Sequence, residues 1–174
     1  MNMKKYVFFL LICLFTLNAF AQKTPTAQSV LDKAFKQAKK QNKKVFLIFH
    51  ASWCGWCKRM EKAILDKNCK DFFEKNYIIT YLTVLESPAN KSLENQGASE
   101  VMKKYGGEGQ GLPYWVILDK NGSMLEDSKD KGENIGCPVE DFEVDAFIEK
   151  LKKTSNITND DIKNIRSRFL ANKN

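Results

Sequence analysis

The sequence has a single histidine, His50, and only five cysteines among 174 residues. A structural zinc site needs four closely placed cysteine or histidine ligands, which commonly come as two pairs at short spacing. One such pair is present, Cys54 and Cys57, whereas Cys69 and Cys137 stand apart from it and from each other. This shortage of ligands argues against a metal centre, and the residues imply no organic cofactor.

The sequence also lacks, after its first 21 residues, any apolar run long enough to span a bilayer. Residues 1–21 combine a basic start, a short apolar run and the triplet Ala19-Phe20-Ala21. This pattern is typical of a secretory signal peptide, with cleavage expected between Ala21 and Gln22. We therefore expect a soluble protein, exported to the periplasm or the extracellular space. The alternative is a retained membrane anchor, for which the apolar run is short.

No internal repeat and no low-complexity tract is present, so the 153 residues after residue 21 suit one domain. Removing Lys4 and Lys5 with the signal peptide leaves 26 basic and 21 acidic residues, a net charge of +5. Lys33, Lys36 and Lys40 recur at helical spacing, which indicates a solvated helix face rather than a polyanion site. Nucleic acid is therefore not an expected partner.

Hydrophobic periodicity predicts the element order α-β-α-β-α-β-β-α-α. The predicted elements are a helix over 30–41 capped by Ser29, strand 45–49, helix 58–66, strand 77–85, helix 92–105, strands 114–119 and 123–126, and helices 139–152 and 158–171. Strands that alternate with helices imply parallel pairing, and the late hairpin adds antiparallel strands. The predicted fold class is α/β, with a mixed central sheet flanked by helices.

The Cys-x-x-Cys pair directly follows strand 45–49 and opens the next helix. The first turn of a helix presents unpaired N–H groups and the positive end of the dipole, which together stabilise a thiolate on Cys54. Cys57 lies one turn further on, and we expect it to be the more buried of the two. It can form a disulfide with Cys54 and can also resolve a mixed disulfide there. The intervening Gly55 and Trp56 leave Cys54 accessible.

The stretch Trp53-Cys54-Gly55-Trp56-Cys57-Lys58 resembles the active site of the thioredoxin superfamily, in particular its exported branch with an aromatic residue before the second cysteine. A second match is the stretch GLPYWVILDKNG, residues 111–122, in which the resemblance implies a cis proline at Pro113 that faces the pair. The resemblance covers roughly residues 28–152. It implies a thioredoxin fold over 22–153, followed by a helical extension over 154–174.

The resemblance also implies roles for the residues around the catalytic pair. Trp53, Leu112 and Pro113 would border a substrate groove, with the backbone of residue 112 pairing with an extended substrate. Lys58 would add positive potential beside Cys54, unless it is only a solvated helix residue.

Two positions depart from the family pattern. Family reductases often bury an aspartate six residues before the first cysteine as a proton acceptor, and here that residue is Ile48. We expect His50 either to take this proton or only to pack beneath the site. Trp56 replaces the common proline between the cysteines, so the redox potential of relatives does not carry over.

Two further cysteines remain outside the pair. We expect Cys69 to be a buried, apolar residue. Cys137 follows Gly136, which resembles a groove glycine of the family, so Cys137 is expected near Cys54 as a structural or accessory thiol. A Cys69–Cys137 disulfide is not expected, because the two lie at opposite ends of this arrangement.

The sequence thus predicts an exported thiol–disulfide oxidoreductase that acts on protein disulfides and thiols, as a reductase or isomerase rather than a disulfide donor. A reductase in an oxidising compartment needs a partner, which we expect to be a membrane-bound electron donor. The alternative is a thioredoxin-like binding module with a static disulfide. The last helix is expected to dock Ile162, Ile165 and Phe169 on the body instead of presenting them to a partner.

Overall fold

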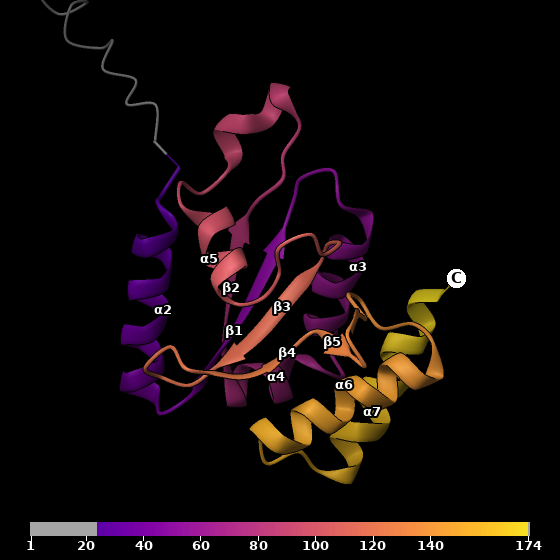
Figure 1. Ribbon diagram of the computed structural model, residues 1–174. Helices are drawn as coiled ribbons and strands as arrows, with labels where there is room; N and C mark the ends of the chain where they lie inside the picture. The colour runs from indigo at the N-terminus through magenta and orange to yellow at the C-terminus, as the bar shows by residue number, and fades with distance from the viewer. Residues whose placement is uncertain (1–23, 174) are drawn as a thin grey trace, which may run out of the picture.

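The computed structural model describes residues 24–173, so the predicted signal peptide lies outside the described residues. Its centre is a four-stranded sheet in the order β2-β1-β3-β4 (Figure 1). The strands are β1 (Lys44–His50), β2 (Tyr77–Thr83), β3 (Tyr114–Leu118) and β4 (Met124–Asp127). β1 runs parallel to β2 and antiparallel to β3, and β3 pairs antiparallel with β4. The predicted mixed sheet is therefore confirmed.

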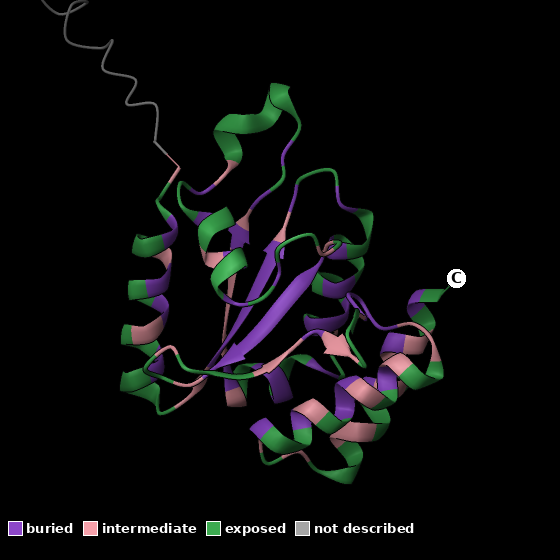
Figure 2. Ribbon diagram, in the orientation of Figure 1, coloured by how far each residue is buried: buried purple, intermediate pink, exposed green. Residues whose placement is uncertain are grey.

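Helices cover both faces of this sheet (Figure 1). Successive residues of a strand point to opposite faces, so Phe46 enters one hydrophobic cluster while Leu47 enters the other. The helices on the Leu47 face are α2 (Ala27–Gln41) and α5 (Ala98–Lys104). The helices on the Phe46 face are α3 (Gly55–Ile64), α4 (Lys70–Asn76), α6 (Asp141–Thr154) and α7 (Asn159–Leu170). Figure 2 shows the central strands buried between these layers.

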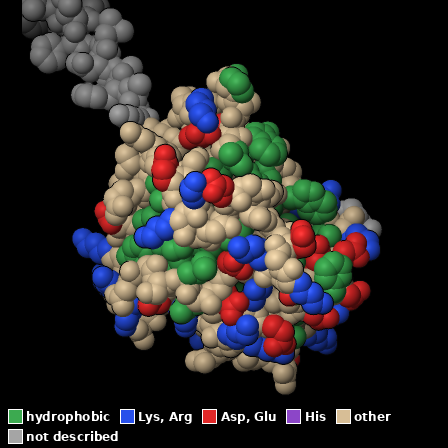
Figure 3. Space-filling model, viewed as in Figure 1, with side chains coloured by type: hydrophobic (Ala, Val, Ile, Leu, Met, Phe, Trp, Pro, Cys, Tyr) green, Lys and Arg blue, Asp and Glu red, His purple; other side chains and the backbone are tan. Residues whose placement is uncertain are grey.

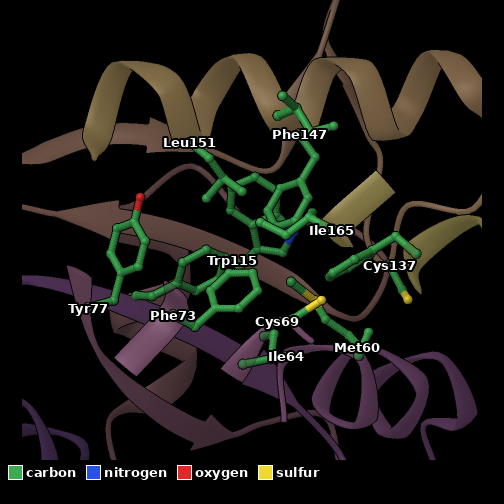
Figure 4. Packing of buried hydrophobic residues seen from close by; sticks show 14 of the residues in the cluster. Met60, Ile64, Cys69, Phe73, Tyr77, Trp115, Cys137, Phe147, Leu151 and Ile165 are labelled. Carbon is green, nitrogen blue, oxygen red and sulfur yellow. The ribbon is translucent and has the colours of Figure 1, made fainter. Parts of the chain in front are cut away.

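The last helix docks on the body, as predicted. Thr158 begins α7 through a capping box, in which its hydroxyl and the Asp161 carboxylate bond to each other's backbone N–H groups. Ile165 and Phe169 are fully buried, and the Phe169 ring centroid lies 5.0 Å from that of Phe147 in α6. Figure 4 shows Ile165 and Phe147 in the same cluster as Trp115 of β3. A 3-10 helix, η2 (Ala171–Lys173), follows α7.

The first helix begins earlier than predicted, and the expectation that Ser29 caps it is wrong. Thr26 is the capping residue, and its Oγ1 accepts a hydrogen bond from the Ser29 N–H at 3.2 Å. The helix starts here because Ala27, not Val30, is the first residue of its buried stripe.

The single helix predicted over 92–105 is also wrong. A 3-10 helix, η1 (Pro88–Leu93), precedes α5, and Gly97 between them has a φ of +84° that interrupts any continuous helix. The Asn95 side chain accepts from the Thr83 N–H at 2.7 Å and donates to the Pro25 carbonyl at 2.8 Å. These tertiary hydrogen bonds keep the segment from joining the helix.

Other elements were missed or have different ends. α4 was not predicted: a turn at Asp66 separates it from α3, and its Phe72 and Phe73 are buried. The ribbon of β5 (Lys129–Asp130) and β6 (Glu133–Asn134) lies in a segment predicted as loop. α6 is shifted two residues toward the C-terminus because Glu143 accepts from the N–H groups of Val139 and Glu140.

No helix within residues 24–173 is both long and apolar enough to cross a bilayer.

Candidate active site

Cys54 and Cys57 form a disulfide, with an S–S distance of 2.04 Å, at the start of α3. Cys54 is the capping residue of this helix, and its Sγ accepts a hydrogen bond from the Cys57 N–H at 3.1 Å. The same N–H group and the positive end of the helix would stabilise a thiolate on Cys54 after reduction.

The two cysteines are almost equally buried, with 3% of Cys54 and 5% of Cys57 exposed. The expectation that Cys57 would be the more buried is therefore wrong for the disulfide form. The reason is that Ala51 and Leu112 pack against the pair as one small cluster, which covers Cys54 as well as Cys57.

The tryptophans beside the disulfide lie at the surface, with 58% of Trp53 and 45% of Trp56 exposed. In the view of Figure 3, hydrophobic side chains lie at the upper right and also on the left, and charges of both signs are interspersed across the lower part. Exposed tryptophans are typical of surfaces that contact other proteins.

A groove of about 490 Å³ lies beside the pair, and Trp56, Leu112, Pro113 and Cys137 are among its lining residues. The Leu112–Pro113 peptide bond is cis, as the resemblance implies.

Gly136 closes the groove against Pro113. A Cβ atom on Gly136 would lie 3.4 Å from the Pro113 carbonyl oxygen, and its φ is +52°, so glycine suits this position. The neighbouring Asn134 side chain donates to the carbonyls of Gly111, at 2.8 Å, and Pro113, at 3.2 Å.

The loop before the pair is held by Glu86, a buried residue that sequence reasoning missed. The Glu86 carboxylate accepts from the Ser52 N–H through Oε1 and from the Ser52 hydroxyl through Oε2, at 2.7 Å. The Trp53 Nε1–H donates to the Leu85 carbonyl at 2.8 Å. The segment after β2 thus positions both residues that precede Cys54. The only signal in the sequence was an acidic residue directly after a predicted strand.

His50 lies half-buried at the end of β1. Its Nε2 lies 3.2 Å from the Thr83 Oγ1, and its ring centroid lies 5.2 Å from that of Tyr81. Burial lowers the pKa of His50, against the opposing charges of Glu61 and Glu86. No hydrogen bond within the described residues joins His50 to Cys54 or Cys57.

Three further positions discussed from the sequence are Ile48, Gly55 and Lys58. Ile48 is buried in the core on the α3 side, so no carboxylate occupies the place where family reductases keep one. Gly55 and Lys58 are exposed on the first turn of α3. The neighbouring Arg59, which sequence reasoning did not single out, lies over Trp56, with its Cζ 4.6 Å from the ring centroid.

Cys69 and Cys137 are buried free thiols and are not joined to each other, as expected. They belong to the same hydrophobic cluster (Figure 4), although Cys137 also lines the groove. Burial raises the pKa of Cys69 to about 11 and that of Cys137 to about 12. In the part of the chain that the structure describes, no three His, Cys, Asp or Glu side chains are grouped as metal ligands.

Known proteins resemble this chain in family and in fold. The model of a thioredoxin-like domain family matches residues 31–128, which include Cys54, Cys57 and Pro113. A disulphide isomerase from Xylella fastidiosa Temecula1 is 20% identical, with a TM-score of 0.56 over 78% of this chain and 98% of that chain. The oxidised C-terminal domain of Neisseria meningitidis DsbD is 22% identical, with a TM-score of 0.46 over 75% and 98%. No curated protein is similar enough to match.

Proposed function

Because the chain belongs to the thioredoxin-like domain family, we propose that it is an exported thiol–disulfide oxidoreductase that reduces or isomerises protein disulfides. The observation that carries this proposal is the Cys54–Cys57 disulfide at the N-terminus of α3, beside a groove that contains the cis bond before Pro113. The disulfide lies where a helix N-terminus favours the thiolate and where a second polypeptide has room to bind.

The reaction needs only the two cysteines. In the reduced protein, the Cys54 thiolate attacks one sulfur of a substrate disulfide, which breaks the substrate S–S bond and releases one substrate thiolate to be protonated. The thiol of Cys57 then gives its proton to water or to His50 and attacks the Cys54 Sγ. This attack releases the second substrate thiolate and forms the Cys54–Cys57 disulfide, so that two electrons have passed to the substrate.

The surrounding residues bind and orient the substrate in this proposal. Trp53, Trp56 and Pro113 border the chain that carries the reacting disulfide. The backbone N–H and C=O of Leu112 make no hydrogen bond within residues 24–173, so both are available to pair with an extended substrate. Lys58 supplies positive potential near Cys54, and Gly55 leaves the approach to Cys54 open.

The proposed compartment determines what a reductase would need. The features of residues 1–21 support export, and an exported pair is kept oxidised by its surroundings unless electrons are supplied. A reductase or isomerase of this kind therefore requires a membrane-bound electron donor as its partner.

The second candidate is a thioredoxin-like binding module with a static disulfide, and the deep burial of Cys54 and Cys57 favours it. Insulin reduction in the presence of dithiothreitol separates the two. We expect the wild-type protein to accelerate insulin precipitation, Cys54→Ser to abolish the acceleration and Cys69→Ser to retain it. A wild-type protein without acceleration would identify the binding module.

The reduction potential of the pair then tests the direction. Equilibration with glutathione should give a value closer to the roughly −270 mV of thioredoxin than to the roughly −120 mV of a strong disulfide donor. A value near the second figure would contradict the reductase assignment while leaving the oxidoreductase intact.

A further inference from the structure

The C-terminal 3-10 helix η2 contacts the active-site helix α3 through Asn172, a buried residue of which 6% is exposed. Three groups of this residue have partners on three different parts of the chain. Its backbone carbonyl accepts from the Arg59 Nη1 at 2.7 Å, its Oδ1 accepts from the Arg168 Nη1 at 2.7 Å, and its Nδ2 donates to the Cys137 Sγ at 3.6 Å. Asn172 therefore joins η2 to α3, to α7 and to the groove.

The orientation of the Asn172 amide is set by these partners. A guanidinium can only donate hydrogen bonds, so the atom that faces Arg168 must be the amide oxygen, and the NH₂ group must face Cys137. Arg168 is itself held by Asp66, with Nε 3.2 Å from the carboxylate. The position of η2 is thus fixed by Arg168 on one side of the Asn172 amide and by Cys137 on the other.

Arg59 connects the anchored segment η2 to Trp56, the residue that precedes Cys57. Its guanidinium bonds the Asn172 carbonyl and also lies over the ring of Trp56, the residue between Gly55 and Cys57. An arginine on an exposed helix surface loses side-chain entropy when it is held in one place, and the carbonyl bond supplies a fixed partner. The cation–π contact with Trp56 then holds a positive charge over the residue that lies between Gly55 and Cys57.

We propose that Asn172 is a positioning residue that holds Arg59 over Trp56 and thereby shifts the redox equilibrium of the Cys54–Cys57 pair toward the reduced form. The inference rests on the proposed function in that it takes the pair to be redox-active. Its physical basis is that a guanidinium held near the start of α3 adds to the helix N-terminus in stabilising a thiolate. The segment that supplies the carbonyl lies outside residues 31–128, so this anchorage belongs to the C-terminal extension and not to the matched family domain.

The test is the glutathione redox equilibrium of the pair in single and double variants of the full chain. The measured quantity is the ratio [GSH]²/[GSSG] at which half of the Cys54–Cys57 pair is reduced. Arg59→Gln should raise this ratio by about twofold to fivefold, the size expected for one solvent-screened charge. Asn172→Ala should shift it in the same direction by a smaller factor, because the loosened carbonyl holds Arg59 only part of the time. The double variant should match Arg59→Gln alone, since the two residues act in series.

Two controls separate positioning from general destabilisation. Lys173→Ala removes the neighbouring surface contact with Glu140, at 2.8 Å, and should leave the equilibrium unchanged. Arg59→Lys keeps the charge and should recover much of the wild-type ratio. Arg59 lies on an exposed surface, so its variants should remain folded even if Asn172→Ala does not.

The result that overturns the inference is an Arg59→Gln equilibrium equal to that of the wild type, or a Lys173→Ala shift as large as that of Asn172→Ala. Failure of the proposed function would be seen in insulin reduction and not in this experiment, because the glutathione equilibrium needs no protein substrate. A protein inactive on insulin can still show the Arg59 and Asn172 shifts, and an active one can lack them.

Discussion

Cys54 and Cys69 occupy the same formal position, the residue that precedes the first turn of a helix, but their surroundings are opposite. The backbone of Cys54 is extended, and its sulfur turns back to accept the Cys57 N–H. The backbone of Cys69 is helical, its side chain makes no capping hydrogen bond, and it points into the core between α3 and α7. The Cys54 sulfur lies at a helix N-terminus, two residues from Trp56 of the groove, whereas the Cys69 sulfur is enclosed in the core.

This difference shows that a helix N-terminus does not by itself activate a cysteine. The sulfur must also point at the free N–H groups and must be reachable by a second sulfur. Cys69 fails both conditions, because its side chain makes no capping hydrogen bond and is completely buried. Burial and the nearby Asp66 carboxylate also raise its pKa to about 11. Cys137 is intermediate: it lines the groove, but burial raises its pKa to about 12.

The largest expected effect is that of removing the second active-site cysteine, Cys57. Cys57→Ala removes the resolving thiol, so insulin turnover should be lost and Cys54 should accumulate as a mixed disulfide after exposure to oxidised glutathione. Cys69→Ala combined with Cys137→Ala should retain turnover. Mass spectrometry of the intact protein counts the adducts, and peptide mapping shows which cysteine carries them. An adduct on Cys69 or Cys137 in the Cys57→Ala variant would contradict the contrast.

The second largest effect concerns the hydrophobic cluster that buries Cys69 and Cys137. Phe169 packs on Phe147 in the cluster that buries both free thiols, so Phe169→Ala should lower the free energy of unfolding by about 3–5 kcal/mol. The same variant should speed alkylation of Cys69 and Cys137. Phe142, with 64% of its surface exposed, is the matched control, and Phe142→Ala should change stability by no more than about 0.5 kcal/mol. Urea unfolding and iodoacetamide labelling measure both, and equal effects of the two substitutions would refute the docked position of α7.

A smaller effect is the pH dependence that Cys69 imposes on stability. Burial raises its pKa from an ordinary value of 9.0 to about 11, so between these values the folded protein holds a proton that the unfolded chain releases. The free energy of unfolding should therefore fall as the pH rises above 9, by at most about 1.4 kcal/mol per pH unit for this thiol. Cys69→Ala should show a shallower decline in urea unfolding at pH 8 to 10. Parallel curves for the two proteins would mean that Cys69 is not enclosed as described.

The smallest effect is at His50, below the active-site loop. Its lowered pKa means that the unfolded chain binds this proton more readily, so stability should fall slightly as the pH drops below the ordinary value of 6.5. His50→Gln keeps a partner for Thr83 and should remove this acid dependence in urea unfolding. The rate of insulin reduction by the same variant at pH 7 distinguishes its two roles: an unchanged rate leaves His50 a packing residue, and a slower rate makes it a proton acceptor for Cys57.

The class of fold and the position of the cysteine pair could both be predicted from the sequence, because both depend on local patterns. The apolar run Val45 to Phe49 predicts a buried strand, and the pair directly after it must open the next helix. The last helix was predicted within a residue or so because Thr158 and Asp161 form a capping box within four residues. Such signals need no knowledge of the rest of the chain.

The distant residues that support the site could not be predicted in this way, because they meet only in the folded protein. Glu86 binds Ser52 across 34 residues, and Asn172 binds Arg59 across 113, and no periodicity in the sequence marks either partner. The break between η1 and α5 is equally long-range, because the Asn95 side chain bonds to Thr83 and Pro25. Buried polar groups must find partners, but which partners they find depends on how the helices pack on the sheet. That packing also enclosed Cys69 and left Cys54 beside a groove.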